Sequence, residues 1–563
     1  MSDTLSGSQL PRQVADAYVD ALIALDPITG TYLGVAESSS KLPDFSPAGR
    51  EAVAELARTT LDKLTAAERL PGGDSDAERR CARLLRERLT AELAVHEADE
   101  DLRAVSNIHS PVHSVREVFT LTPADTDEDW AAIAERLRAV PDALEGYRAC
   151  LALGLERELY GAPRPTATFV GQLTAWAGED EGAAFFDEFA AGGPEALAGE
   201  LGEAAKGATA AVVALRDWMR DVYAPAVEGR PETVGRERYA RWSRYFNGTD
   251  LDLDEAYAYG WSEYHRLLGE MKAEADKILP GSDPWEALRH LDEHGTHIEG
   301  VDEVQAWLQG LMDEAIEALD GTHFELAERV RKVESRIAPP GGAAAPYYTG
   351  PSEDFSRPGR TWLPTMGATR FPVYDLVSTW YHEGVPGHHL QIAQWAHVAD
   401  QLSRYQATVG IVSANAEGWA LYAERLMDEL GFLKDAEQRL GYLDCQMMRA
   451  CRVIVDIGMH LGLEIPADSP FRPGERWTPD LAQEFFGLHS GRPADFVVSE
   501  LTRYLSMPGQ AVGYKLGERA WLLGRDNARA AHGDAFDAKA WHMAALSQGS
   551  LGLDDLVDEL SKL

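Results

Sequence analysis

Hydrophobic positions recur at helical spacing through most of this 563-residue chain. Apolar side chains three or four positions apart place one face of a helix against a core. Tyr257, Trp261, Tyr264 and Leu268 keep to one such face, which favours a packing role over a ligand site. The pattern predicts a mainly α fold, with long helices within residues 14–25, 49–70, 76–104, 127–160, 180–223, 231–278, 410–430 and 436–463.

Some stretches depart from this pattern. Pro141 is expected to break residues 127–160 into two helices, and residues 168–176 look like a connector. Residues 345–364 are rich in Gly, Pro and aromatic side chains, which suits short strands and turns. We expect one helical domain, residues 1–563, with a change of texture that separates an N-terminal half, 1–335, from a catalytic half, 336–563.

Charge excludes two classes of partner. The formal net charge is −39, from 53 basic and 92 acidic residues. Nucleic-acid binding needs a basic footprint, and anionic membranes attract basic segments, so we expect neither partner. The acidity gives a weak preference for neutral or cationic substrates, although solubility alone also explains it.

Cysteine usage and the first residues predict a location. The four cysteines, Cys81, Cys150, Cys445 and Cys451, form no CxxC motif, which fits a reducing compartment. Residues 1–6 have neither a basic start nor an apolar run, and no stretch approaches the length of a membrane span. We therefore expect a cytoplasmic protein, and the sequence leaves its oligomeric state open.

The densest group of metal-capable side chains lies in residues 382–389, His-Glu-Gly-Val-Pro-Gly-His-His. In zinc hydrolases, two histidines four residues apart on a helix bind the metal, and the glutamate beside the first accepts a proton from water. Here position 386 is proline, and the next histidines come six and seven residues after His382. A kink at Pro386 and Gly387 could return a later histidine to the metal. We favour His388, with His389 as its rival.

A second candidate group follows on residues 410–430. Glu417 lies 29 residues after His388, and Glu424 lies seven residues further, on the same helical face. Glutamate-liganded zinc peptidases take their third ligand from a helix at about this distance. Alone, the two glutamates are more simply a solvent-facing pair; together with His382-Glu383 they favour a metal site.

Three blocks, residues 382–389, 345–364 and 500–517, resemble a large bacterial family labelled domain of unknown function 885. That family is placed by analogy among zinc peptidases of the thermolysin-like, glutamate-liganded group. The resemblance implies a helical enclosure around a deep channel, with a small sheet beside the metal helix. It also implies Glu417 as the third ligand and Glu424 as a residue that orients a ligand.

The other two blocks supply expected substrate contacts. An edge strand carrying Tyr347 and Tyr348 could hold an extended peptide, although a purely structural hairpin fits equally well. Tyr514 resembles the tyrosine that stabilises the oxyanion in related oligopeptidases, and Arg503 is the other candidate donor. The remaining expected substrate contacts are Tyr504 and Gln510.

These residues predict a zinc-dependent hydrolase that cuts short peptides. His382, His388 and Glu417 hold one Zn²⁺, and Glu383 takes the proton of the attacking water. The alternatives are an amidase or other C–N hydrolase acting on a modified small molecule, and a non-catalytic helical binding protein. No GxSxG, GxxxxGK[ST] or GxGxxG motif points to serine or nucleotide chemistry.

Overall fold

Helices make up most of the structure, as the hydrophobic spacing predicts, and the strands are few and short. The computed structural model describes residues 9–179, 182–338 and 345–563. The first residues, which contributed to the expected location, lie outside this range. Contacts divide the chain into two units. The first contains residues 1–78, 89–234 and 499–507, and the second contains residues 79–88, 235–498 and 508–563. The predicted halves, residues 1–335 and 336–563, stay a prediction, because units defined by contacts need not fold independently.

In its described part, the first unit contains helices joined by loops and no strands. Its elements are α1 (Pro11–Leu25), α2 (Pro27–Tyr32), η1 (Ala36–Ser38), α3 (Pro47–Ala67), η2 (Glu100–Arg103), α5 (Pro111–Leu121), α6 (Asp127–Glu156), α7 (Pro163–Trp176), α8 (Phe185–Ala191), η3 (Glu195–Leu197), α9 (Ala198–Trp218), η4 (Met219–Tyr223) and α10 (Ala224–Val227). Residues of α4 (Asp76–Glu97) and α21 (Ala494–Ser506) are shared between the two units.

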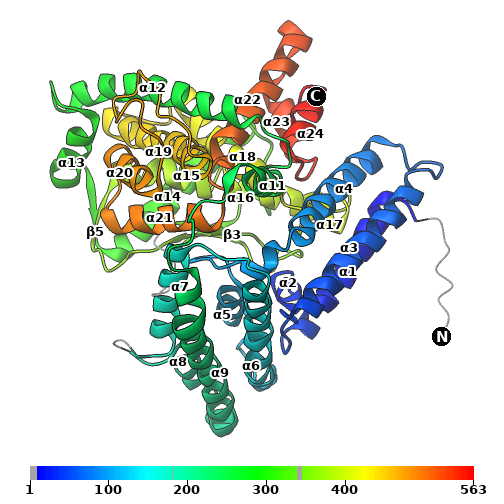
Figure 1. Cartoon of the computed structure of the whole chain (residues 1–563). Helices are drawn as coiled ribbons and strands as arrows, with labels where there is room; N and C mark the ends of the chain where they lie inside the picture. The colour runs from blue at the N-terminus through cyan, green and yellow to red at the C-terminus, as the bar shows by residue number, and fades with distance from the viewer. Residues whose placement is uncertain (1–8, 180–181, 339–344) are drawn as a thin grey trace. The chain divides into compact units, whose positions relative to one another are not determined.

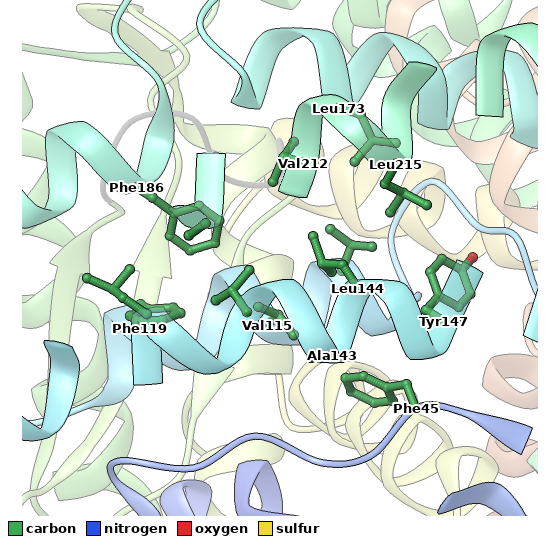
Figure 2. Packing of buried hydrophobic residues seen from close by; sticks show 14 of the residues in the cluster. Phe45, Val115, Phe119, Ala143, Leu144, Tyr147, Leu173, Phe186, Val212 and Leu215 are labelled. Carbon is green, nitrogen blue, oxygen red and sulfur yellow. The ribbon is translucent and has the colours of Figure 1, made fainter. Parts of the chain in front are cut away.

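The core of the first unit forms between α5, α6 and α9. Figure 2 shows Phe119 of α5, Leu144 of α6 and Leu215 of α9 among its side chains. Each is at most 2% exposed, and burying a side chain of this size contributes about 1.5–3 kcal/mol.

Two expectations about this unit are wrong. Helix α6 continues through Pro141, and residues 168–176 belong to helix α7. Apolar burial outweighs the local signals: Val140 and Leu144 flank the proline in the core, and Phe169 is fully buried on α7. Proline inside a helix removes one hydrogen bond, which the packing of the flanking turns offsets.

The second unit contains the remaining helices and all the strands described. Its elements are α11 (Gly235–Asn247), α12 (Leu253–Ile278), α13 (Pro284–His294), β1 (His297–Glu299), α14 (Val301–Leu319), β2 (Val333–Ile337), β3 (Tyr347–Thr349), β4 (Gly359–Leu363), β5 (Arg370–Pro372), α15 (Val373–Glu383), α16 (His388–His397), α17 (Arg404–Ala407), α18 (Ser413–Glu429), α19 (Ala436–Leu461), α20 (Pro479–His489), α22 (Gly513–His532), η5 (Gly533–Ala535), α23 (Ala538–Leu546) and α24 (Leu553–Leu560).

Helix α19 is the central element of the second unit. Every residue from Leu440 to His460 is buried, and α12, α15 and α20 pack around it (Figure 1). Helix α18 packs on α15 and, more extensively, on α22. At that crossing a Cβ on Gly418 would lie 2.3 Å from the backbone carbon of Gly517, so the two helices meet through glycine.

A three-stranded sheet lies against α16. Its order is β2-β4-β3, with β2 parallel and β3 antiparallel to β4, so β3 is an edge strand. Both β3 and β4 contact α16, and the indole of Trp380 on α15 donates to Ser335 of β2 at 3.0 Å. The small sheet beside the histidine motif is therefore present. A second, two-stranded sheet pairs β1 with β5. Within the described residues, no helix combines the length and apolarity needed to cross a bilayer.

The glycine contact between α18 and α22 predicts a stability effect. Gly418→Ala places a methyl group inside the backbone of α22, and overpacking of this kind costs about 1–3 kcal/mol. Gly269→Ala is the matched control, because Gly269 is an exposed helical glycine with open space at its Cβ position. Urea unfolding should show a lower free energy of unfolding for Gly418→Ala than for the parent. For Gly269→Ala the free energy of unfolding should rise by about 0.5–1 kcal/mol. Equal stabilities would contradict the contact.

Buried His542 predicts acid sensitivity. Its Nε2 is hydrogen-bonded to the Tyr422 hydroxyl at 2.7 Å, and burial lowers the pKa of His542 to about 3. An unfolded histidine titrates near pH 6.5, so the unfolded chain binds more protons between pH 6.5 and 3, and stability falls as the pH falls. At pH 5 this difference is about 2 kcal/mol. Unfolding measured from pH 7 to 5 should have a flatter pH dependence in His542→Gln than in the parent. An unchanged slope would contradict the assignment.

Candidate metal centre

The histidine motif spans two helices and the tight turn between them. Helix α15 ends at Glu383, residues 384–387 form a short turn, and α16 begins at His388. The Val385–Pro386 peptide is cis. The N–H of Gly387 donates to the carbonyl of Tyr381 at 3.0 Å, which folds the turn back onto the end of α15. The expected kink takes the form of a four-residue interruption between two helices, crossed by backbone hydrogen bonds.

Gly387 is required by this close approach. A Cβ at that position would lie 1.9 Å from the carbonyl oxygen of His382, well inside contact distance. Only glycine lets the chain pass over the last turn of α15. The turn brings His388 opposite His382, with their rings 4.7 Å apart and nearly perpendicular.

Three side chains converge at this point. Oε2 of Glu417, on α18, lies 3.4 Å from Nε2 of His382 and 3.5 Å from Nε2 of His388. His382, His388 and Glu417 are the one group of three in the described chain whose potential ligand atoms all lie within 4.8 Å of one another. Ligand atoms at about 2.1 Å from a tetrahedral zinc are about 3.4 Å apart, which matches the separations of 3.4 and 3.5 Å found here.

Buried polar atoms of the cluster that lack hydrogen-bond partners also suit a metal site. Oε2 of Glu417 and Nδ1 of His388 are buried and have no hydrogen-bond partner among the described residues. A buried carboxylate oxygen without a partner is costly, and a cation between the three residues would remove that cost. The side chains of His388 and Glu417 are 12% and 21% exposed, so the cluster is open to solvent on one side.

Glu424 holds the outer face of His382. Its Oε1 accepts from Nδ1 of His382 at 2.7 Å, and Ser378 donates to Oε2 at 2.6 Å. With the proton on Nδ1, Nε2 of His382 is left as a lone-pair donor toward the centre of the cluster. Carboxylates orient metal-binding histidines in this way. Glu424 therefore lies where a ligand-orienting residue is expected.

Electrostatics favour a cation at the centre. Burial alone would lower the pKa of His382, but Glu417 and Glu424 raise it to about 9. Burial alone would raise the pKa of Glu417, but the two imidazoles hold it well below its usual range. The carboxylates therefore attract positive charge to the position between Nε2 of His382 and Oε2 of Glu417.

Glu383 lies beside the cluster without a fixed partner. It is 8% exposed, and within the described chain its carboxylate makes no hydrogen bond or ion pair. Burial raises the pKa of Glu383, while His382 and His388 act in the opposite direction. A buried carboxylate with a raised pKa is suited to accept and return a proton.

His389 points away from the cluster. Its Nε2 donates to the carbonyl of Val330 at 2.7 Å, and its Nδ1 accepts from the Tyr348 hydroxyl at 3.0 Å. Both nitrogens are therefore occupied, and burial lowers the pKa of His389 to about 4. The geometry thus distinguishes the two histidines that spacing alone left open. Tyr348 serves as a packing partner of His389 in this arrangement.

Two other predicted residues lie in the second unit near α18 and α22. The amide of Gln510 donates to Ser413, one turn before Glu417 on α18, at 3.4 Å. Tyr514 is half-buried on the first turn of α22, and the Arg452 guanidinium lies 4.6 Å from the centre of its ring. Tyr347 is 39% exposed on edge strand β3 and stacks on Trp362. Their roles toward substrate stay predictions.

Arg503 and Tyr504 belong to the first unit. Both bind Glu500: the Arg503 guanidinium donates to it at 3.0 and 2.7 Å, and the Tyr504 hydroxyl donates at 2.6 Å. The structure therefore gives both side chains a carboxylate partner within their own unit. Their proposed contacts with a transition state or substrate stay predictions.

Sequence reasoning missed the residue that ties the turn to α18. The indole of Trp419, which is fully buried, donates to the carbonyls of Pro386 and Gly387 at 2.9 and 3.1 Å. Trp419 thereby fixes the turn between the two histidines against the helix that carries Glu417. Its position two residues after Glu417 was visible in the sequence, but nothing in the sequence indicated its hydrogen-bond partners.

Comparisons with known proteins agree on the fold. The chain resembles a "putative lipoprotein" from Colwellia psychrerythraea, with a TM-score of 0.82 and 20% identity over 98% of this chain and 99% of that one. It also resembles a "putative lipoprotein of unknown function" from Shewanella oneidensis, with a TM-score of 0.73 and 18% identity over 98% and 100% of the two chains. At these identities the likeness concerns the fold alone.

Sequence comparison identifies the family without an activity. No protein with a curated description matches the chain. The profile of a family described as "Bacterial protein of unknown function (DUF885)" matches residues 27–560, which is nearly the whole chain. The protein therefore belongs to the bacterial family known as domain of unknown function 885.

Proposed function

We propose that the protein is a zinc-dependent hydrolase and that its substrates are short peptides. The observation that carries the proposal is the convergence of His382, His388 and Glu417 at separations that suit a tetrahedral zinc. Three protein ligands with one open side are typical of catalytic zinc sites, whereas structural sites are closed by four. Glu383, next to the first ligand, supplies the proton-transfer group that such chemistry needs.

The chain's own residues divide the reaction between them. A zinc ion in this site supplies Lewis-acid chemistry, lowering the pKa of water and polarising a carbonyl. His382, His388 and Glu417 bind the ion, and Glu424 orients His382. Glu383 accepts a proton from the attacking water at its carboxylate and returns it to the leaving amine. Tyr514, which belongs to the same unit as the cluster, is the proposed donor to the oxyanion.

The sheet supports a peptide as substrate. Strand β3 pairs only with β4 among the described strands, and the sheet contacts α16, which begins with His388. An edge strand offers backbone groups to an extended chain. A modified small-molecule amide would undergo the same chemistry, so hydrolysis of a panel of short peptides and acylated amines distinguishes the two substrate classes.

We further propose a reducing compartment, the cytoplasm, for this chain. All four cysteines lie in the described residues, and none forms a disulfide. Each of the two similar solved structures is described as a "putative lipoprotein", and that description favours a location outside the cytoplasm. Fractionation of the native host with an antibody to the full-length product decides between them.

Glu383→Gln separates metal binding from catalysis. The substitution keeps the size of the side chain and removes its ability to take a proton, so zinc should stay bound while turnover falls about 10²–10⁴-fold. Zinc content by atomic emission and peptide hydrolysis by mass spectrometry measure the two effects. Hydrolysis at the parent rate would exclude Glu383 as the base.

Histidine substitutions test which side chains hold the ion. Protein prepared without chelator should contain about one zinc per chain, and chelation should abolish hydrolysis until zinc is restored. His388→Ala should lose zinc, whereas His389→Gln should retain it, because His389 binds Val330 and Tyr348 instead.

Each metal measurement has a contradicting result. Less than about 0.2 zinc per chain in the parent protein would favour a non-catalytic binding protein. Loss of zinc from a folded His389→Gln variant, with retention in His388→Ala, would reverse the ligand assignment. Circular dichroism of each variant confirms that the fold is intact.

A further inference from the structure

A chain of buried hydrogen bonds leads from the candidate metal centre to a lysine on α22. Glu424, which accepts a hydrogen bond from Nδ1 of His382, also accepts one from the amide nitrogen of Gln446 at 3.4 Å. The amide oxygen of Gln446 in turn accepts from Nζ of Lys515 at 3.0 Å. Gln446 is 1% exposed and Lys515 is fully buried, so water does not compete for these contacts.

Lys515 fixes which way the Gln446 amide faces. An amide can turn by 180°, exchanging its donor and acceptor ends. An ammonium group only donates and a carboxylate only accepts, so between Lys515 and Glu424 a single orientation satisfies both. The reversed amide would set two donors together at Lys515 and two acceptors together at Glu424. The lysine thereby keeps the N–H of Gln446 directed at Glu424.

The lysine is itself held in place by carboxylates. Nζ of Lys515 lies 3.0 Å from Glu263 on α12 and makes a closer contact with Glu518 on its own helix. Glu518 also forms an ion pair with Arg425, the residue after Glu424 on α18, at 3.1 Å. Two routes therefore connect Lys515 to α18, one through Gln446 and one through Glu518 and Arg425. A buried lysine placed this way has no freedom to turn away from Gln446.

We propose that Gln446, oriented by Lys515, is a positioning residue for the metal centre: it holds the Glu424 carboxylate in the rotamer that presents Nε2 of His382 to the ion. This inference rests on the proposed zinc site and extends it by two residues. Without the amide, Ser378 is the one close partner that Oε2 of Glu424 keeps among the residues described, and the carboxylate that orients His382 loses one of its supports. Outer groups of this kind tune metal affinity by about 10–100-fold.

Gln446→Met tests the proposal, because it preserves the side-chain length and removes both hydrogen bonds. The control is Gln394→Met: Gln394 is similarly buried, but its amide donates to Ser547 and has no contact with Glu424. Zinc dissociation constants, measured by competition with a chromophoric chelator, should rise about tenfold for Gln446→Met and less than about twofold for Gln394→Met. Thermal unfolding of the metal-free variants shows whether both retain the fold.

A double-mutant cycle tests the route through Glu424. In a Glu424→Gln background the orienting carboxylate is gone, so adding Gln446→Met should change the zinc dissociation constant by less than about twofold. The same tenfold loss in both backgrounds, or no loss in the single variant, would overturn the proposal and leave the zinc site standing. A parent protein that binds no zinc would remove the proposed function itself, and this inference with it.

Discussion

The candidate site depends on one backbone constraint, the short turn at residues 384–387. The Gly387 N–H bonds to the carbonyl of Tyr381, and the absence of a Cβ on Gly387 allows the chain to cross the last turn of α15. A continuous helix would place His388 about 120° from the face of His382. The turn instead starts a new helix with His388 at its first position, and the imidazole rings of His382 and His388 lie 4.7 Å apart and nearly perpendicular.

Helix α18 carries three further side chains on which the site depends. Glu417 completes the cluster, Trp419 binds the carbonyls of the turn, and Glu424 holds Nδ1 of His382. These three side chains span only two turns of one helix, so any displacement of α18 would disturb all three contacts together. The close glycine contact with α22 limits that displacement. Packing at Gly418 and geometry at the site are therefore parts of one arrangement.

The sequence predicted the site better than its surroundings, for a physical reason. His382, Glu383 and Glu417 could be found because metal-binding residue types at short spacing carry a local signal. The choice of His388 over His389 could not be made from spacing, because it depends on where the turn interrupts the helix. Gln446 and Lys515 gave no signal at all, since their meaning comes from contacts between α18, α19 and α22. The predicted break at Pro141 was wrong for the same reason, because burial of the neighbouring residues of α6 outweighed the tendency of proline to break a helix.

Charge balance connects the cluster to its surroundings. Glu383, Glu417 and Glu424 place three carboxylates around His382, and Arg449 lies 3.8 Å from Glu424. When all three carboxylates are ionised they exceed Arg449 by two negative charges; His382, whose pKa is raised, can carry one compensating positive charge, and a divalent cation would supply both. Burying carboxylates without such compensation costs several kcal/mol each. The carboxylates raise the pKa of His382 because they stabilise positive charge at this position, and a bound divalent cation would supply that charge in place of the proton.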